Sequence, residues 1–173
     1  MALINKVLPG YVATLWCQDD ANPTAFTDTQ LGTWANVETL IGTSAGGTGT
    51  AGIQVPVESI PAFGADDASA TYAVAGARTG AKITTQNQVT SLTITSAWNP
   101  ADTAQLLIRD DGYNGTIIRT YTIAVYDGTD TVAYSFNARV GGLQWDMSPS
   151  AEGKFTFVLH PVGGNSYGWS NNA

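Results

Sequence analysis

The sequence contains few of the residues that build disulfides, metal centres and membrane spans. Cys17 is the only cysteine, which excludes an intramolecular disulfide, and His160 is the only histidine. Without a Cys-x-x-Cys motif, a Cys/His metal site is not expected. No hydrophobic run is long enough to cross a bilayer, and Pro9 and Gly10 interrupt the apolar residues near the start, which argues against a secretory signal. We therefore expect no metal, no cofactor and no membrane association.

Charged residues are also scarce. They make up 12% of the 173 residues, whereas about a quarter is usual in globular proteins. Seven basic and fourteen acidic residues give a net charge of −7, which argues against tight binding to nucleic-acid phosphates. Because a soluble monomer normally carries more charge, this composition suggests that other subunits cover part of the surface.

No set of residues predicts catalysis. His160 is the only candidate base for a nucleophilic triad, and no Gly-x-Ser-x-Gly elbow accompanies it. The acidic pairs at 19–20 and 66–67 lie among small and polar residues, which is typical of solvated turns rather than of paired catalytic carboxyls. Residues 110–115 begin like a calcium loop, but Tyr121 occupies the place of its last acidic ligand. We therefore expect neither an enzyme nor a metal-binding protein.

Alternating apolar and polar residues predict a mainly β protein. The pattern indicates strands at 11–18, 32–42, 89–98, 117–125 and 132–140, with further strands in "LQWDM" and "KFTFVLHPV". The sequence "DGTD" at 127–130 predicts the turn of a hairpin. Pro56 and Pro61 remove backbone donors, so they assign "IQVPVESIPAF" to a sheet edge or an extended connection.

One short helix is expected between two of these strands. Asn99 can cap it, Pro100 suits its first turn, and Asp102 favours the positive end of its dipole. Gly112 offers a stop, so the helix would start at about residue 100 and span under three turns. We therefore expect one domain over residues 1–173, an antiparallel β-sandwich or partly closed barrel with a single flanking helix and long protruding loops.

Three segments lack a core-forming pattern. The stretch "GTSAGGTGTAG" at 42–52 has almost no side chain to anchor it, which predicts a flexible loop unless something outside the domain orders it. Residues 64–88 are too long for a simple connection and predict a protruding hairpin or arm. Residues 162–173 are interpreted as an extended arm. All three are candidate assembly elements.

Four passages together point to a known family. They are "PGYVATLW", "YAVAGARTGAKITTQNQVTSLTITSAWNPADTAQLLI", "RTYTIAVYDGTDTVAYSFNARVGGL" and "GKFTFVLHPVG". The most distinctive pattern within them consists of Trp98, Pro100, Asp102, Gln105 and Leu106 or Leu107. With these passages the chain resembles the major tail tube proteins of long-tailed, non-contractile bacteriophages. The 42–52 stretch and the Trp-containing C-terminal arm depart from the family pattern.

The resemblance implies hexameric rings that stack head to tail into a hollow tail tube of the virion. DNA would pass through the tube during genome delivery without specific binding. The partners would be further copies of the chain and the tail tip or initiator, tape measure and terminator proteins. Subunit contacts are expected at Gly46, Gly47, Thr48, Tyr72, Val74, Arg78, Lys82 and Trp169. Glu38 and Glu58, on predicted strands, are expected to be acids that line the channel.

The aromatic residues leave a second interpretation open. The chain has five tryptophans and seven tyrosines. Trp16 and Trp98 are expected in the core, whereas exposed Trp34, Trp145 and Trp169 could form either subunit contacts or a sugar-stacking platform. The alternative function is therefore a carbohydrate-binding β-sandwich module, such as a virion decoration or a secreted lectin-like protein.

Overall fold

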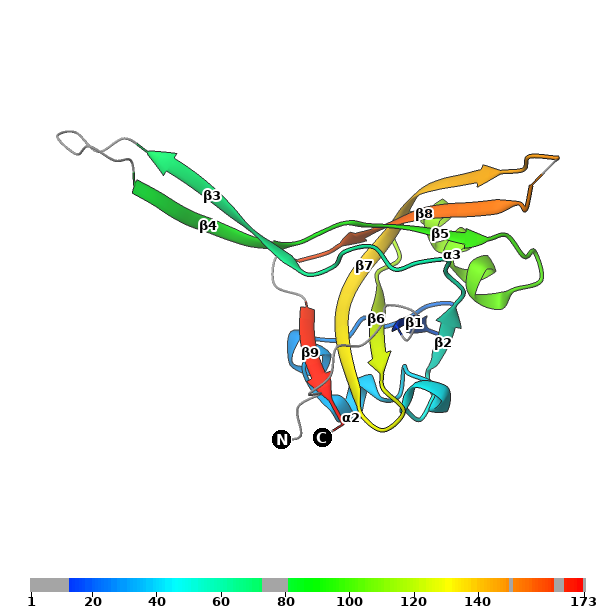
Figure 1. Cartoon of the computed structure of the whole chain (residues 1–173), viewed down its shortest axis with the longest axis horizontal. Coiled ribbons are helices and arrows are strands. Elements are labelled where there is room, and N and C mark those ends of the chain that lie inside the picture. The colour runs from blue at the N-terminus through cyan, green and yellow to red at the C-terminus, as the bar shows by residue number, and fades with distance from the viewer. Residues whose placement is uncertain (1–12, 73–80, 150, 164–166, 173) are drawn as a thin grey trace.

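The computed structural model describes residues 13–72, 81–149, 151–163 and 167–172, with the backbone alone for 65–72 and 81–88. Nine strands, which pair antiparallel throughout, dominate the described part (Figure 1). The strands are β1 Ala13–Gln18, β2 Gly52–Val55, β3 Ala65–Tyr72, β4 Ala81–Val89, β5 Leu92–Ala97, β6 Arg119–Tyr126, β7 Thr131–Asp146, β8 Lys154–Pro161 and β9 Tyr167–Asn171. The helices are α1 Asp28–Leu31, α2 Trp34–Val37, the 3-10 turn η2 Thr43–Ala45 and α3 Thr103–Asn114.

Strand β7 is shared by three neighbours. The main sheet has the order β2-β1-β6-β7-β8-β5, and β9 also pairs with β7. Residues 131–138 of β7 pair with β6, residues 138–146 pair with β8, and residues 132–136 pair with β9. The register with β8 shifts between Gly141 and Gln144, where Gly142 has a φ of +58°, and Figure 1 shows the strand strongly curved. The predicted "LQWDM" strand is therefore the second half of β7.

The sheet curls toward closure without closing. Strands β2 and β5 lie at the two ends of this strand order, and β9, which pairs with β7 alone among the described strands, forms a further edge. The chain that follows β2 crosses to the other edge, where the Glu58 N–H donates to the Thr95 carbonyl at 3.0 Å. This arrangement confirms the mainly β, antiparallel fold predicted from the sequence. Pro56 and Pro61 follow the edge strand β2, as the missing donors of proline require.

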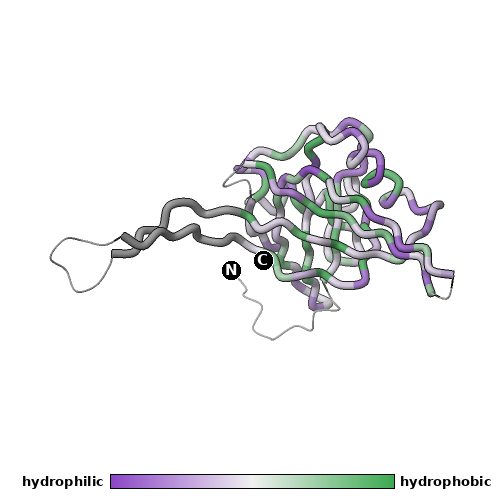
Figure 2. Tube along the Cα trace, turned by 90° about the horizontal axis from the view of Figure 1, so that it is seen from above, coloured by the Kyte–Doolittle hydropathy of each residue, from purple (hydrophilic) through white to green (hydrophobic). Residues whose placement is uncertain are grey.

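Both faces of the sheet are covered at its centre. All six residues from Arg119 to Ala124 are buried, so β6 does not alternate between core and solvent. One face carries the main apolar core, whose members include Leu15, Ile94, Tyr121, Phe136, Phe155, Phe157 and Leu159. The other face is covered by a smaller apolar cluster that contains Trp16, Val37, Ile41, Ala45, Ala124 and Ala133. Figure 2 shows hydrophobic and hydrophilic positions following one another along the strands of the body.

Residues 32–42 form helix α2 and a turn, so the strand predicted there is wrong. A capping box at Thr27 and Gln30 starts α1, and α2 follows after Gly32 and Thr33. Val37, Leu40 and Ile41 are fully buried, and their spacing of three and four is helical rather than alternating. The described chain thus contains two single-turn helices besides the one that was expected.

Helix α3 begins and ends later than its sequence predicts. Asp102, not Asn99, is the N-cap, and its carboxylate accepts from the Gln105 N–H at 2.9 Å. Asn99 instead forms a turn by accepting from the Ala101 N–H. The helix continues through Gly112, whose missing side chain leaves room for Leu143, and ends at Gly115 with a φ of +66°.

Within the Trp98–Leu107 passage, Gln105 has a structural role that its residue type explains. Its side chain is fully buried. Its Nε2 donates to the Ser96 Oγ and to the Ala97 carbonyl, both at 2.7 Å, while its Oε1 accepts from the Asn99 N–H. Because buried amides must be satisfied, this residue fixes the first turn of α3 against the end of β5.

A buried ion pair joins α3 to the sheet. The Arg119 side chain is completely buried, and its Nε and Nη2 donate to the two carboxylate oxygens of Asp111 at 2.7 and 3.0 Å. Its Nη1 donates to the carbonyls of Gln18 and Asp20, both at 2.6 Å. Burial lowers the pKa of Arg119, but its hydrogen bonds to Asp111 and the charge of Asp111 outweigh this effect, so the pKa is raised above its ordinary value. The guanidinium thus stays charged and holds three segments together.

Replacing Asp111 tests this pair. In Asp111→Asn the guanidinium remains buried without a counter-charge, so we expect the free energy of unfolding to fall by about 3–5 kcal/mol. The matched control is Asp110→Asn, because the neighbouring carboxylate is exposed and, among the described residues, pairs with the half-buried Arg109. Surface changes of that kind are usually within about 0.5 kcal/mol. Urea titrations of both variants measure the difference, and equal losses would contradict the assignment.

Candidate assembly surfaces

The arm predicted at 64–88 is confirmed as a hairpin in its described part. Strands β3 and β4 form a separate two-stranded sheet, paired from Ala65 with Val89 to Tyr72 with Ala81, with an irregularity at Ala68 and Ser69. Figure 1 shows this hairpin projecting away from the body. Eight residues of strand extend about 27 Å, so the arm is long enough to contact another molecule.

The root of the arm is continuous with the main sheet. Only two residues separate β4 from β5, Val89 packs against the main core, and the Thr90 N–H donates to the Gly64 carbonyl at 3.1 Å. Of the predicted contact residues, Tyr72 and Lys82 belong to the far end of the paired strands. Val74 and Arg78 lie outside the described residues.

The 42–52 loop is anchored by its own chain, so the prediction that nothing within the domain holds it is wrong. The N–H groups of Thr48, Gly49 and Ala51 donate to the carbonyls of Glu38, Ile41 and Thr39 at 2.8–2.9 Å. The sequence prediction considered side chains alone, whereas here the backbone supplies the bonds. Thr131 adds one further bond, because its Oγ1 donates to the Ala45 carbonyl at 2.8 Å.

Two of the glycines predicted as contact residues face the interior of the chain. Gly46 has a φ of +82°, and a Cβ there would collide with the Thr131 hydroxyl. A Cβ on Gly47 would collide with the Ile41 carbonyl oxygen and approach that of Glu38 to 2.6 Å. Thr48 is exposed. Close packing within the chain therefore explains why glycine stands at 46 and 47. Both positions are partly exposed, so contacts of Gly46, Gly47 and Thr48 with another subunit stay a prediction.

The C-terminal segment folds back on the body and is not a free arm. Residues 167–171 form β9, which pairs with β7 from Phe136 opposite Tyr167 to Val132 opposite Asn171. The Asn172 Oδ1 accepts from the Thr131 N–H at 2.9 Å. Gly168 lies directly against the backbone of Leu31 and Gly32, so the segment is held from the side of α1 as well.

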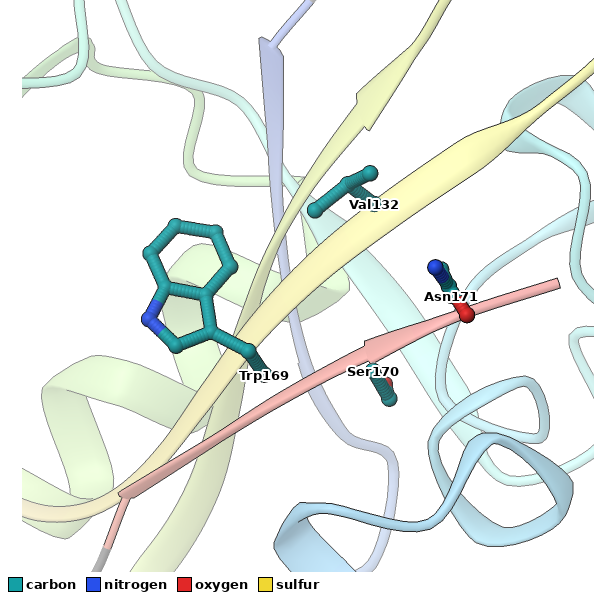
Figure 3. Close-up of a pocket in the computed structure, with 4 residues that line it drawn as sticks. All are labelled: Val132, Trp169, Ser170 and Asn171. Carbon is teal, nitrogen blue, oxygen red and sulfur yellow. The ribbon is translucent and has the colours of Figure 1, made fainter. Parts of the chain in front are cut away.

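Trp169 remains exposed on this strand. It is 54% exposed, and its ring packs on Tyr134 and Phe63 with centroids 4.9 and 6.1 Å apart. Beside it is an open, largely apolar hollow of about 250 Å³, lined by Val132, Trp169, Ser170 and Asn171 (Figure 3). Burial raises the pKa of Tyr134 to about 12, so its hydroxyl stays neutral beneath Trp169.

The other tryptophans do not form an exposed platform. Trp16 is buried and Trp98 packs against the core, as expected. Trp34 and Trp145 were predicted to be exposed, but each packs against an apolar cluster. Trp145 also stacks on Phe155 at 5.1 Å and on exposed Tyr113 at 6.5 Å. The exposed large apolar side chains of the described residues are Tyr113, Met147 and Trp169.

The two acids predicted to line a channel do not lie on strands. Glu38 is the C-cap of α2, and its carbonyl accepts from the Thr48 N–H. Glu58 follows β2 and pairs with the Lys154 Nζ at 3.0 Å. Their predicted location within strands is therefore wrong, while their orientation in an assembly stays a prediction.

Titratable groups in the described part show no catalytic arrangement. The His160 Nδ1 lies 3.4 Å from the exposed Ser91 hydroxyl, and no acidic group completes a triad among the hydrogen bonds of the described residues. Burial raises the pKa of the Cys17 thiol to about 12, so the reactive thiolate is absent near neutral pH. Within the same residues, no cluster of His, Cys, Asp and Glu could hold a metal ion, and no helix is long and apolar enough to cross a membrane.

Comparison with known proteins identifies the fold. No family model and no curated protein sequence matches the chain. Among solved structures, the sheath/tube terminator of the PVC extracellular contractile injection system matches with a TM-score of 0.61 at 13% identity, covering 99% of this chain and 100% of that one. The PVC sheath-tube complex matches at 0.58 and 14%, covering 98% and 94%. The tail of an empty gene transfer agent particle matches at 0.55 and 12%, covering 96% and 100%.

These matches support the tail-tube-like fold that the sequence resemblance implied. Because the sequence identities are only 12–14%, these matches are evidence for a shared fold and for nothing further. The resemblance was to non-contractile tails, whereas two of these three structures come from a contractile system. The fold therefore does not restrict the chain to non-contractile tails.

The packing of the 42–52 loop gives a direct test. In Gly47→Ala the new methyl group must displace the Ile41 carbonyl, so we expect a loss of about 1–3 kcal/mol in the free energy of unfolding. Gly32→Ala is the matched control, because a Cβ there meets nothing within 4 Å and φ is −93°. Thermal and urea unfolding of both variants measure the effect. A loop that is free in the isolated chain would tolerate the two changes equally.

Proposed function

We propose that this chain is a structural subunit that assembles with copies of itself into stacked hexameric rings, which form the hollow tube of a phage-like tail. The observation that carries the proposal is the fold likeness to tube and tail structures over 96–99% of the chain. The proposed role is structural and not enzymatic, and its place is the virion tail.

The described surface suits such an assembly. The subunit has a projecting arm, formed by β3 and β4, and open strand edges at β2 and β5, so its different sides present unlike surfaces. Contacts between unlike surfaces form rings when the rotation closes, and they form extended stacks when repeated along an axis. Open strand edges can be paired by a neighbour. The arm is the element that we assign to contacts between subunits, through Tyr72, Val74, Arg78 and Lys82.

The charge of the chain suits a conduit for DNA. Six copies at −7 each carry a formal charge of −42, and an acidic wall would repel phosphates, so DNA could slide without adhering. Glu38 and Glu58 remain our candidates for the lining. The tail tip or initiator, the tape measure and the terminator are the partners that such a tube would require.

A terminator is the second candidate function. Its basis is the match to a sheath/tube terminator over the whole of both chains. A terminator would form a single ring at the end of a tube, whereas a tube subunit would stack rings without a fixed limit. The two functions therefore differ in the product of assembly.

Negative-stain microscopy of the purified chain tests the proposal. We expect rings that stack into hollow tubes whose length increases with protein concentration. Because tube growth can require an initiator, the experiment is repeated with purified tail tips as seeds. Single rings that never stack would assign the terminator function, and dispersed single particles in both experiments would contradict assembly altogether.

Charge reversal on the arm tests its role in assembly. Arg78 and Lys82 are two of the seven basic residues in an acidic chain, so Arg78→Glu with Lys82→Glu should repel a neighbouring subunit and slow tube growth at least tenfold. The melting temperature should not change, because β3 and β4 pair only with each other within the described sheets. The control is Arg139→Glu, an exposed position on β7. Light scattering measures growth, and equal rates for the two variants would remove the arm from the interface.

A further inference from the structure

A group of exposed hydrogen-bonding side chains crosses three neighbouring strands of the main sheet. Strands β5, β8 and β7 are consecutive in this sheet (Figure 1). Arg139 on β7 is the register partner of His160 on β8, and the hydroxyl of Ser91, directly before β5, lies 3.4 Å from the His160 Nδ1. All three residues are exposed, whereas the adjacent Leu92 and Leu159 are buried in the main core. Because side chains alternate along a strand, the group lies on the face of the sheet opposite to that core.

Gly141 shows how the imidazole ring of His160 is oriented. A Cβ at Gly141 would lie 3.1 Å from both Cδ2 and Nε2 of His160, so this edge of the ring lies over β7. The edge that carries Nδ1 faces the Ser91 hydroxyl on the other side. When this hydroxyl donates to Nδ1, the proton of the neutral ring is on Nε2. Nε2 is then a donor directed toward β7, on the same face and strand as Arg139.

The guanidinium of Arg139 has no counter-charge in the part of the chain that the structure describes. Neither an ion pair nor a hydrogen bond joins its side chain to another described residue. Strands β5, β7 and β8 contain one acidic residue, Asp146, which is the register partner of Lys154. Asp146 stands about 20 Å from Arg139 along β7. In an acidic chain, these strands thus present an exposed positive group without a neighbouring acid of their own.

We propose that Arg139 and His160 bind a phosphate group on this face, while Ser91 holds the imidazole in position. The planar guanidinium can donate two parallel hydrogen bonds to two oxygens of one phosphate, and Nε2 can donate to a third oxygen. Because the residues are exposed, the site accepts either free phosphate or a phosphate of a nucleic-acid strand.

Binding at this site is weak and complete within one subunit. Two donor side chains in a chain of net charge −7 give a dissociation constant of about millimolar order, since the overall charge repels anions. A contact of this strength does not hold DNA in place, so it is compatible with a conduit. The site needs no second subunit, and therefore it does not depend on the proposed function.

NMR titration of the full chain tests the site. His160 is the only histidine, so its ring signals are unambiguous. Inorganic phosphate is added at constant pH, with sodium chloride keeping the ionic strength constant, and we expect the ring signals to shift along a saturable curve. In Arg139→Gln the dissociation constant should rise about fivefold or more, because the two parallel bonds are lost. The matched control is Arg109→Gln, which removes a positive charge from α3 and should leave the curve unchanged.

Several outcomes would overturn the proposal. They are a shift that increases linearly with phosphate, a shift that chloride alone reproduces, and equal dissociation constants for the original chain and Arg139→Gln. Arg139→Lys serves as a second variant because it keeps the charge without the planar fork. Its dissociation constant should lie between those of the other two chains.

An oligonucleotide distinguishes the two sources of phosphate. A short single strand without a terminal phosphate offers only phosphodiesters, and its titration is followed by the same ring signals. Saturation by this strand, weakened in Arg139→Gln, would assign the site to nucleic acid. Saturation by inorganic phosphate alone would assign it to free phosphate. Either result supports the site, and saturation by neither ligand would overturn it.

Discussion

The rest of the structure depends on the need to satisfy one buried guanidinium. Arg119 lies in the apolar interior, where an unpaired N–H costs far more than it does in water. Its partners are the Asp111 carboxylate on α3 and the carbonyls of Gln18 and Asp20, where the chain leaves β1. The full set of bonds forms only when β1, α3 and β6 are all in place. A single side chain on β6 thus joins helix α3 to the end of strand β1.

The shared strand β7 has a complementary role. Because β6, β8 and β9 all pair with it, the body is complete within one chain over the described residues. The arm, by contrast, pairs only with itself among the described strands. The described structure thus consists of a body that is paired within itself and a projecting hairpin that forms a separate sheet.

The fold likeness at 12–14% identity has a physical basis. A sheet core tolerates many combinations of apolar side chains when volume and patterning are kept. Polar contacts impose tighter constraints, such as those of the Gln105 amide beneath α3 and of the hydrogen bond between Thr120 and Asn137. A shared fold can therefore persist where little of the sequence is shared.

The sequence by itself determined the elements whose signals are local. The period-two patterns located β1, β5, β6, β7 and β8, and the length of residues 64–88 predicted the arm, because alternation and turn residues act over a few positions. Tertiary structure alone decided how the 42–52 loop packs and that β9 returns to pair with β7. The Thr131 hydroxyl donates to the Ala45 carbonyl across 86 residues, and the Thr131 N–H donates to the Asn172 side chain across 41 residues. Contacts over such separations leave no periodic trace in the sequence, since each partner is chosen by the folded neighbourhood.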